Sequence, residues 1–129
     1  MKKEYLLTIR NSGAGKSSFT PERHLEFVRQ CEVYIKSLRE KDNLIAAQPI
    51  LRNSIILSKD GNNWKWEKID ESTSFQVGYY HLRAESIEHA IELAKQNPEF
   101  AYVENVQIEI REIKTKESAT GFEYPKGIK

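Results

Sequence analysis

The chain has 129 residues, which is the length of one ordinary domain and enough to bury a single core. Its 20 Lys and Arg residues nearly balance its 19 Asp and Glu residues, so the formal net charge is +1. The charges are interspersed, whereas a protein that binds nucleic acid through its phosphates usually carries a basic excess or stripe. The composition therefore disfavours nucleic-acid binding.

The cysteine and histidine content and the N-terminal segment exclude further classes of protein. Cys31 is the single cysteine, so no intrachain disulfide can form, and the three histidines lack metal-ligand spacing. The first apolar stretch ends at Arg10, which makes it too short for a signal peptide or a membrane span. We expect a cytoplasmic protein with no membrane segment, metal or cofactor.

The first half of the chain predicts a strand, a helix and a second strand. Residues 5–10 alternate in hydrophobicity, and a Gly/Ser-rich loop follows at residues 11–18. Thr20 and Pro21 are typical of a helix start. The helix runs to about residue 41 and is amphipathic, with a predicted buried stripe of Leu25, Val28, Cys31, Ile35 and Leu38. Residues 44–47 form the next strand, which Pro49 ends.

The second half predicts a hairpin, a strand, a helix and a last strand. Residues 50–57 and 64–69 flank the turn sequence Asp60-Gly61-Asn62-Asn63. A strand at residues 75–84 precedes a helix that begins after Ser86 and ends near Pro98. The last strand covers residues 106–113, and residues 115–129 are a polar tail that we expect to be extended or mobile.

This order of elements predicts an α+β fold over residues 1–114. Two helices that each separate strands match the ferredoxin-like βαββαβ arrangement, here with an inserted β-hairpin. Strand 75–84 is apolar on both faces, with Phe75, Val77, Tyr79 and His81 on one of them. A strand of this kind is usually buried on both sides. We therefore expect a homodimer in which the non-helical sheet faces meet; the alternative is a monomer whose hairpin or tail covers that face.

Four short motifs then resemble the YCII-related family. They are Thr20-Pro21-Glu22-Arg23-His24, Ala46-Ala47-Gln48-Pro49, Gly78-Tyr79-Tyr80-His81 and Asn97-Pro98-Glu99-Phe100, within a match that covers residues 4–114. The resemblance implies a dimeric α+β barrel, in which two ferredoxin-like sheets face each other around a cleft.

Two departures from that family bear on chemistry. Many relatives carry an Asp-Gly-Pro-Phe motif where this chain has Trp66-Glu67-Lys68-Ile69. Some members have a His–Asp pair proposed as catalytic; His24 matches the histidine, but the acid position is Asn97. An asparagine cannot ionise, so the family's acid–base mechanism does not transfer directly.

The candidate site combines His24, as the catalytic residue, with four ligand-binding residues. Arg10, Tyr79 and His81 would line the inter-sheet cleft, and Asn97 would be the polar neighbour of His24. Guanidinium, phenol and imidazole groups suit a small anionic or aromatic ligand. The sequence leaves two functions open: a small-molecule or enzymatic site in the dimer cleft, or a non-catalytic interaction or regulatory module with a packed, dry interface.

Two further patterns favour structural roles. Gly13-Ala14-Gly15-Lys16-Ser17 resembles the end of a P-loop, but Arg10 stands where the first glycine of that pattern belongs. We interpret the segment as a surface loop in which Lys16 could contact an anion. Trp64 and Trp66 share one face of the hairpin, where packing is favoured over base stacking because no basic groove lies beside them.

Overall fold

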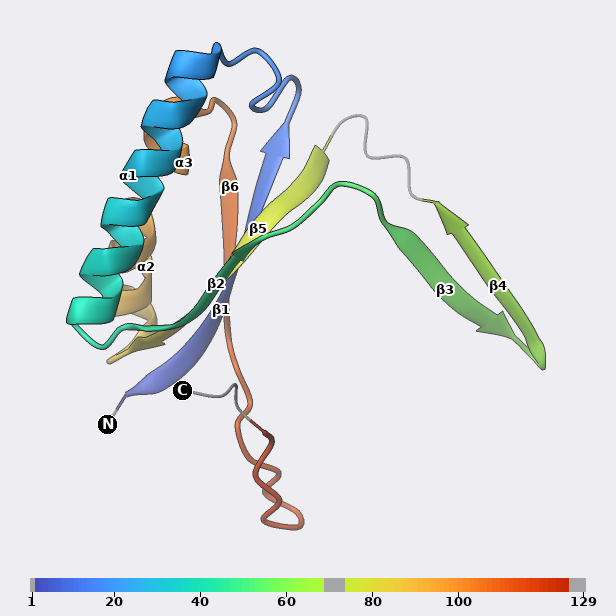
Figure 1. Ribbon diagram of the computed structural model, residues 1–129. Coiled ribbons are helices and arrows are strands. Elements are labelled where there is room, and N and C mark those ends of the chain that lie inside the picture. Colours follow the sequence, from blue (N-terminus) through green and yellow to red (C-terminus); the bar gives the residue numbers. More distant parts are fainter. Residues whose placement is uncertain (1, 69–73, 126–129) are drawn as a thin grey trace.

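The computed structural model describes residues 2–68 and 74–125, and its main feature is a four-stranded antiparallel sheet (Figure 1). The strand order is β2-β5-β1-β6, with β1 at Lys3–Ser12, β2 at Leu44–Pro49, β5 at Ser74–Ala84 and β6 at Gln107–Glu112. Helices α1 (Pro21–Glu40), α2 (Ile87–Lys95) and α3 (Glu99–Tyr102) lie on one side of the sheet. The predicted α+β class is confirmed.

Both long helices begin at the residues that the sequence indicates. The Thr20 hydroxyl accepts a hydrogen bond from the Arg23 backbone N–H at 3.1 Å, and Pro21 occupies the first helical position. The Ser86 hydroxyl likewise accepts from the His89 N–H at 3.1 Å. Helix α3 was not predicted, because one turn carries no hydrophobic period. Among the described residues, no helix is long and apolar enough to span a bilayer.

The hydrophobic core lies between the helices and one face of the sheet. Tyr5, Leu7 and Ile9 of β1 point into it, as alternation predicts, and are at most 3% exposed. Tyr34 and Leu38 of α1 pack there against β5. The stripe of α1 differs from the prediction, since Phe27, Tyr34 and Leu38 are buried while Leu25 is 50% exposed. Leu25 was therefore wrongly assigned to the buried stripe.

A β-bulge corrects the predicted faces of β5. Ile9 pairs with Gly78, but the next residue of β1, Arg10, pairs with Gln76, so Val77 is an extra residue in β5. Phe75, opposite Asn11, becomes buried, and Val77 packs against the core. These two residues therefore do not join Tyr79 and His81 on the open face, and the predicted doubly apolar strand is not the reason for a second copy.

The inserted hairpin is present and stands apart from the main sheet, but its first strand covers 55–60 and not the predicted 50–57. Strands β3 (Ile55–Asp60) and β4 (Asn63–Lys68) pair only with each other, and Figure 1 shows them projecting away from the helices. All twelve residues of the two strands are exposed. Ile69, the predicted last residue of this hairpin, lies outside the described residues.

The described part of the tail, residues 115–125, folds back on itself. Lys116 and Glu123 form a β-bridge, and the Phe122 and Tyr124 rings lie 5.3 Å apart in an edge-to-face contact. The Tyr124 hydroxyl donates to Glu117 at 2.8 Å. This closed turn belongs to neither of the two sheets and contributes no residue to the hydrophobic core.

A matched pair of leucine substitutions tests the position of this core. We expect Leu7→Ala to lower the free energy of unfolding by about 2–5 kcal/mol, because Leu7 is 0% exposed. The same change at Leu25 should cost less than about 1 kcal/mol, since half of that side chain is already in water. Denaturant titration of the two variants measures both values; equal losses would contradict the assignment of faces.

Candidate functional site

A pocket of about 530 Å³ lies between α1 and the β2–β5 side of the sheet. Apolar side chains form most of its wall, among them Ile9, Phe27, Val28, Ile35 and Val77. Polar groups enter it from Lys16, His24, Glu32, Gln48, Tyr80 and Glu99. An apolar cavity of this size with a few convergent polar groups is typical of a small-molecule site.

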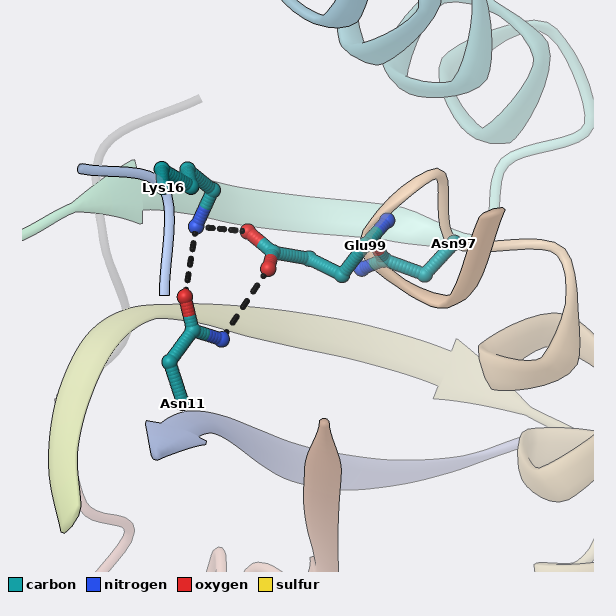
Figure 2. Close-up of polar contacts among 4 residues, drawn as sticks. All are labelled: Asn11, Lys16, Asn97 and Glu99. Atoms are coloured by element: carbon teal, nitrogen blue, oxygen red, sulfur yellow. Dashed lines mark hydrogen bonds and ion pairs between the residues drawn. The ribbon is translucent and has the colours of Figure 1, made fainter. Parts of the chain in front are cut away.

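Lys16 and Glu99 line one side of the pocket, and together with Asn11 behind them they form a buried polar triangle, which Figure 2 shows. The Lys16 ammonium lies 2.7 Å from one Glu99 oxygen and donates to the Asn11 side-chain oxygen at 3.0 Å. The Asn11 amide donates to the other Glu99 oxygen at 3.2 Å. Asn11 and Glu99 are 0% and 6% exposed. Each charge is therefore neutralised and hydrogen-bonded, which buried charges require.

Local backbone features bring these three residues together. Asn11 continues the inward-facing alternation of Tyr5, Leu7 and Ile9 at the end of β1. Gly15 has a φ of +56°, and a Cβ there would lie 2.9 Å from the Phe75 ring, so only glycine fits without a shift. The loop consequently directs Lys16 inward, where its ammonium also lies 5.1 Å from the centre of the Phe27 ring.

A hydrogen bond from the backbone of Glu99 to the side chain of Asn97 fixes the position of Glu99 in the triangle. The Asn97 side-chain oxygen accepts this hydrogen bond from the Glu99 backbone N–H at 2.9 Å, which caps the turn that begins α3. Asn97 is 2% exposed, and its side-chain N–H₂ has no hydrogen-bond partner within the described part of the chain. Arg23 secures the other end of α3, since its guanidinium donates to the Tyr102 carbonyl at 3.1 Å and covers the Tyr102 ring.

The pocket changes the acidity of the groups that line it. The pKa of the Cys31 thiol is raised from 9.0 to about 11, mainly by burial; Glu99 and Glu32 contribute to this rise, and Lys16 opposes it. Burial also raises the pKa of the Tyr80 hydroxyl well above its ordinary value. Both groups are therefore neutral near pH 7, and neither is an activated nucleophile.

The predicted site residues fall on both sides of the sheet. His24 lies on the first turn of α1, exposed, and lines the pocket. Asn97 is buried beside Glu99 and is absent from the pocket wall. Arg10, Tyr79 and His81 belong to the opposite, open face of the sheet, so one copy of the chain does not bring them together with His24.

The open face has its own polar contacts. The His81 ring nitrogen Nε2 lies 2.8 Å from a Glu4 oxygen, and the Glu4 carboxylate is only 6% exposed. Arg10 donates to the Ser74 hydroxyl at 3.3 Å. Arg10 also borders a hollow of about 540 Å³ at the β6 edge of the sheet, which Phe100 and Ile108 line as well. These contacts hold Arg10 and His81 in fixed positions on that face.

Sequence reasoning missed Asn11 and Glu99 as site residues. The alternation of β1, if extended by one inward position, would have placed Asn11 in the core. Glu99 gave no comparable signal, because α3 has only four residues and its position depends on tertiary contacts. Lys16 was assigned to a surface loop, and only the position of Glu99 shows why it points inward.

Comparison with known proteins does not assign this site. No protein-family model matches the chain, and no curated protein matches it either. The resemblance to the YCII-related family therefore rests on the four short motifs. Within residues 2–68 and 74–125, no group of three or more His, Cys, Asp or Glu side chains is arranged to hold a metal ion.

Removing one charge of the triangle tests its energetic role. We expect Lys16→Met to lower the free energy of unfolding by about 2–4 kcal/mol, because Glu99 is left buried and unneutralised. The double variant Lys16→Met/Glu99→Gln should lose less than the sum of the single losses. Lys95→Met is the matched control, since the Lys95–Glu92 pair is largely exposed and should contribute under about 0.5 kcal/mol. Equal losses for Lys16→Met and Lys95→Met would refute the role.

The thiol of Cys31 offers a test by pH. At pH 8 a pKa of about 11 leaves roughly a hundredfold less thiolate than a pKa of 9.0, so alkylation by iodoacetamide should be slower by about that factor than in denaturant. The rate should continue to rise between pH 8 and pH 10. Mass spectrometry measures it at this single cysteine. A plateau near pH 9 would contradict the burial of the thiol.

Proposed function

We propose that the pocket between α1 and the sheet binds a small molecule, and that the chain is a cytoplasmic YCII-related protein. The observation that carries the binding site is the neutralised Lys16–Glu99–Asn11 triangle facing an apolar cavity. A surface lysine would be solvated, whereas this one is 21% exposed and fixed by two partners and an aromatic ring. Such preorganisation is a feature of binding sites.

The ferredoxin-like fold that we propose is supported by the topology of the sheet. Strand β5 lies between β1 and β2, and β1 lies between β5 and β6. Each helical connection thus passes over one intervening strand, as in a split βαβ unit. The exposed hairpin β3–β4 is an insertion between the second and third strands of this arrangement.

The chemistry of the pocket favours an aromatic or branched apolar ligand with one anionic or acceptor group. Lys16 has three N–H donors, of which Glu99 and Asn11 take two. The third N–H and the His24 ring can receive an acceptor oxygen of the ligand. The apolar body would lie along Phe27, Ile35 and Val77. Arg10, Tyr79 and His81 are not required for this site.

Catalysis by His24 is a further part of the proposal. An exposed imidazole at the pocket wall can exchange a proton with a bound molecule. Asn97 cannot assist as an acid, and its contacts support a role in positioning Glu99. Binding is therefore the function that the geometry supports best, and a reaction would need His24 to act without the family's carboxylate.

The alternative function is an interaction module without a ligand. The exposed hairpin favours this alternative, because its exposed apolar side chains are available for contact with a partner protein. The two functions differ in their use of the pocket. An interaction module would leave the pocket empty of small molecules, so a substitution at Lys16 would change stability alone and a substitution at His24 would change neither stability nor binding.

Native mass spectrometry of the purified protein tests the proposed site. We expect a retained small molecule, or binding of small aromatic carboxylic acids used as probes, and slower alkylation of Cys31 when the pocket is occupied. His24→Gln should weaken binding at least tenfold with unchanged stability, because His24 is exposed. Arg29→Gln, also exposed on α1 but outside the pocket wall, is the control. Equal binding by both variants would exclude His24 from the site.

A further inference from the structure

The hairpin β3–β4 has one largely apolar face that the helices and the main sheet of the described chain leave exposed. The register pairs Ile55 with Lys68, Leu57 with Trp66 and Lys59 with Trp64, so all six lie on one side of the hairpin. Four of the six are apolar: Ile55, Leu57, Trp64 and Trp66. We refer to these four residues as the hairpin's apolar face. Their side chains are 60–66% exposed: Ile55 60%, Leu57 64%, Trp64 66% and Trp66 65%. Both tryptophans of the protein belong to this face.

A hairpin of this kind needs a partner surface to be stable. Two strands alone are at best marginally stable in water and usually require a third strand or a packed face. The main sheet of the same copy does not provide that surface, because Figure 1 shows the hairpin projecting away from it. Contiguous exposed apolar side chains mark an interaction surface. The partner must therefore come from outside the copy.

The exposed area of the chain suits a second copy of itself. The chain exposes 9547 Å², whereas a compact monomer of 15.0 kDa exposes roughly 7,000 Å². The difference exceeds the roughly 800 Å² per partner that a stable interface buries. In a dimer with two-fold symmetry, the apolar faces of both hairpins would be buried together. The net charge of +1 causes no strong electrostatic repulsion between the two copies.

We propose that the hairpin β3–β4 is a dimerisation arm, whose apolar face of Ile55, Leu57, Trp64 and Trp66 packs against a second copy of this chain. The inference keeps the homodimer that the sequence predicts, but assigns the hairpin, in place of the open sheet face, as the segment that holds it together. It is independent of the ligand pocket, which lies within one copy. Lys59 and Lys68 lie on the same side of the hairpin, opposite Trp64 and Ile55, and the Lys59 ammonium lies 5.1 Å from the centre of the Trp64 ring.

Two adjacent residues of β3 give a matched test. Leu57 lies on the apolar face and Ile56 on the opposite face, at 64% and 48% exposure. We expect wild-type protein at tens of micromolar to have twice the monomer mass by light scattering. Leu57→Lys should raise the dimer dissociation constant at least tenfold, and Ile56→Lys should change it less than about threefold. Circular dichroism of both variants checks that the main domain remains folded.

Tryptophan fluorescence gives a second measurement on the same samples. Both tryptophans lie on the arm, so the emission maximum should shift to the red on dilution with the midpoint of dissociation. A monomeric wild-type protein would overturn the dimer itself. A dimer that Leu57→Lys and Ile56→Lys weaken equally, or that dissociates without a change in emission, would overturn the arm alone. Ligand binding by monomeric Leu57→Lys protein would show the pocket to be independent of both.

Discussion

The ion pair between Lys16 and Glu99 joins segments that are far apart in the sequence. Lys16 belongs to the loop after β1, Glu99 begins α3, and Asn11 at the end of β1 bonds to both. Without Glu99, the inward-pointing Lys16 would lose its ion-pair partner. Without Lys16, the carboxylate of Glu99, a residue that is 6% exposed, would be left without a neutralising charge. This contact therefore fixes one side of the pocket and couples the sheet, the loop and α3.

The two faces of the main sheet differ in what they carry. The helix-covered face contains the core and the pocket, with Lys16, Glu99 and His24 among its polar groups. The open face carries Arg10, Tyr79 and His81, of which His81 is paired with Glu4. Since the pocket lies within one copy and the proposed dimerisation arm lies apart from it, the two proposals, ligand binding and assembly, can be tested separately.

Much of the fold could be predicted from local patterns, whereas the site could not. The alternation of β1, the caps at Thr20 and Ser86 and the turn at Asp60–Asn63 determine their elements with few distant contacts. The extra residue Val77, the exposure of Leu25 and the position of Glu99 depend on how strands and helices meet in space. Periodicity contains no information on such contacts, and so His24 was grouped with residues of the opposite face.

Solvent exchange of the Lys16 ammonium protons tests the central claim most directly. In protein labelled with ¹⁵N at lysine, two hydrogen bonds and partial burial should slow exchange at Lys16 enough for its ammonium signal to be observed by NMR. The account predicts that this signal is lost in Lys16→Arg and broadened in Glu99→Gln, and that it shifts when a ligand occupies the pocket. A spectrum in which every lysine ammonium exchanges as fast as a solvated one would contradict it.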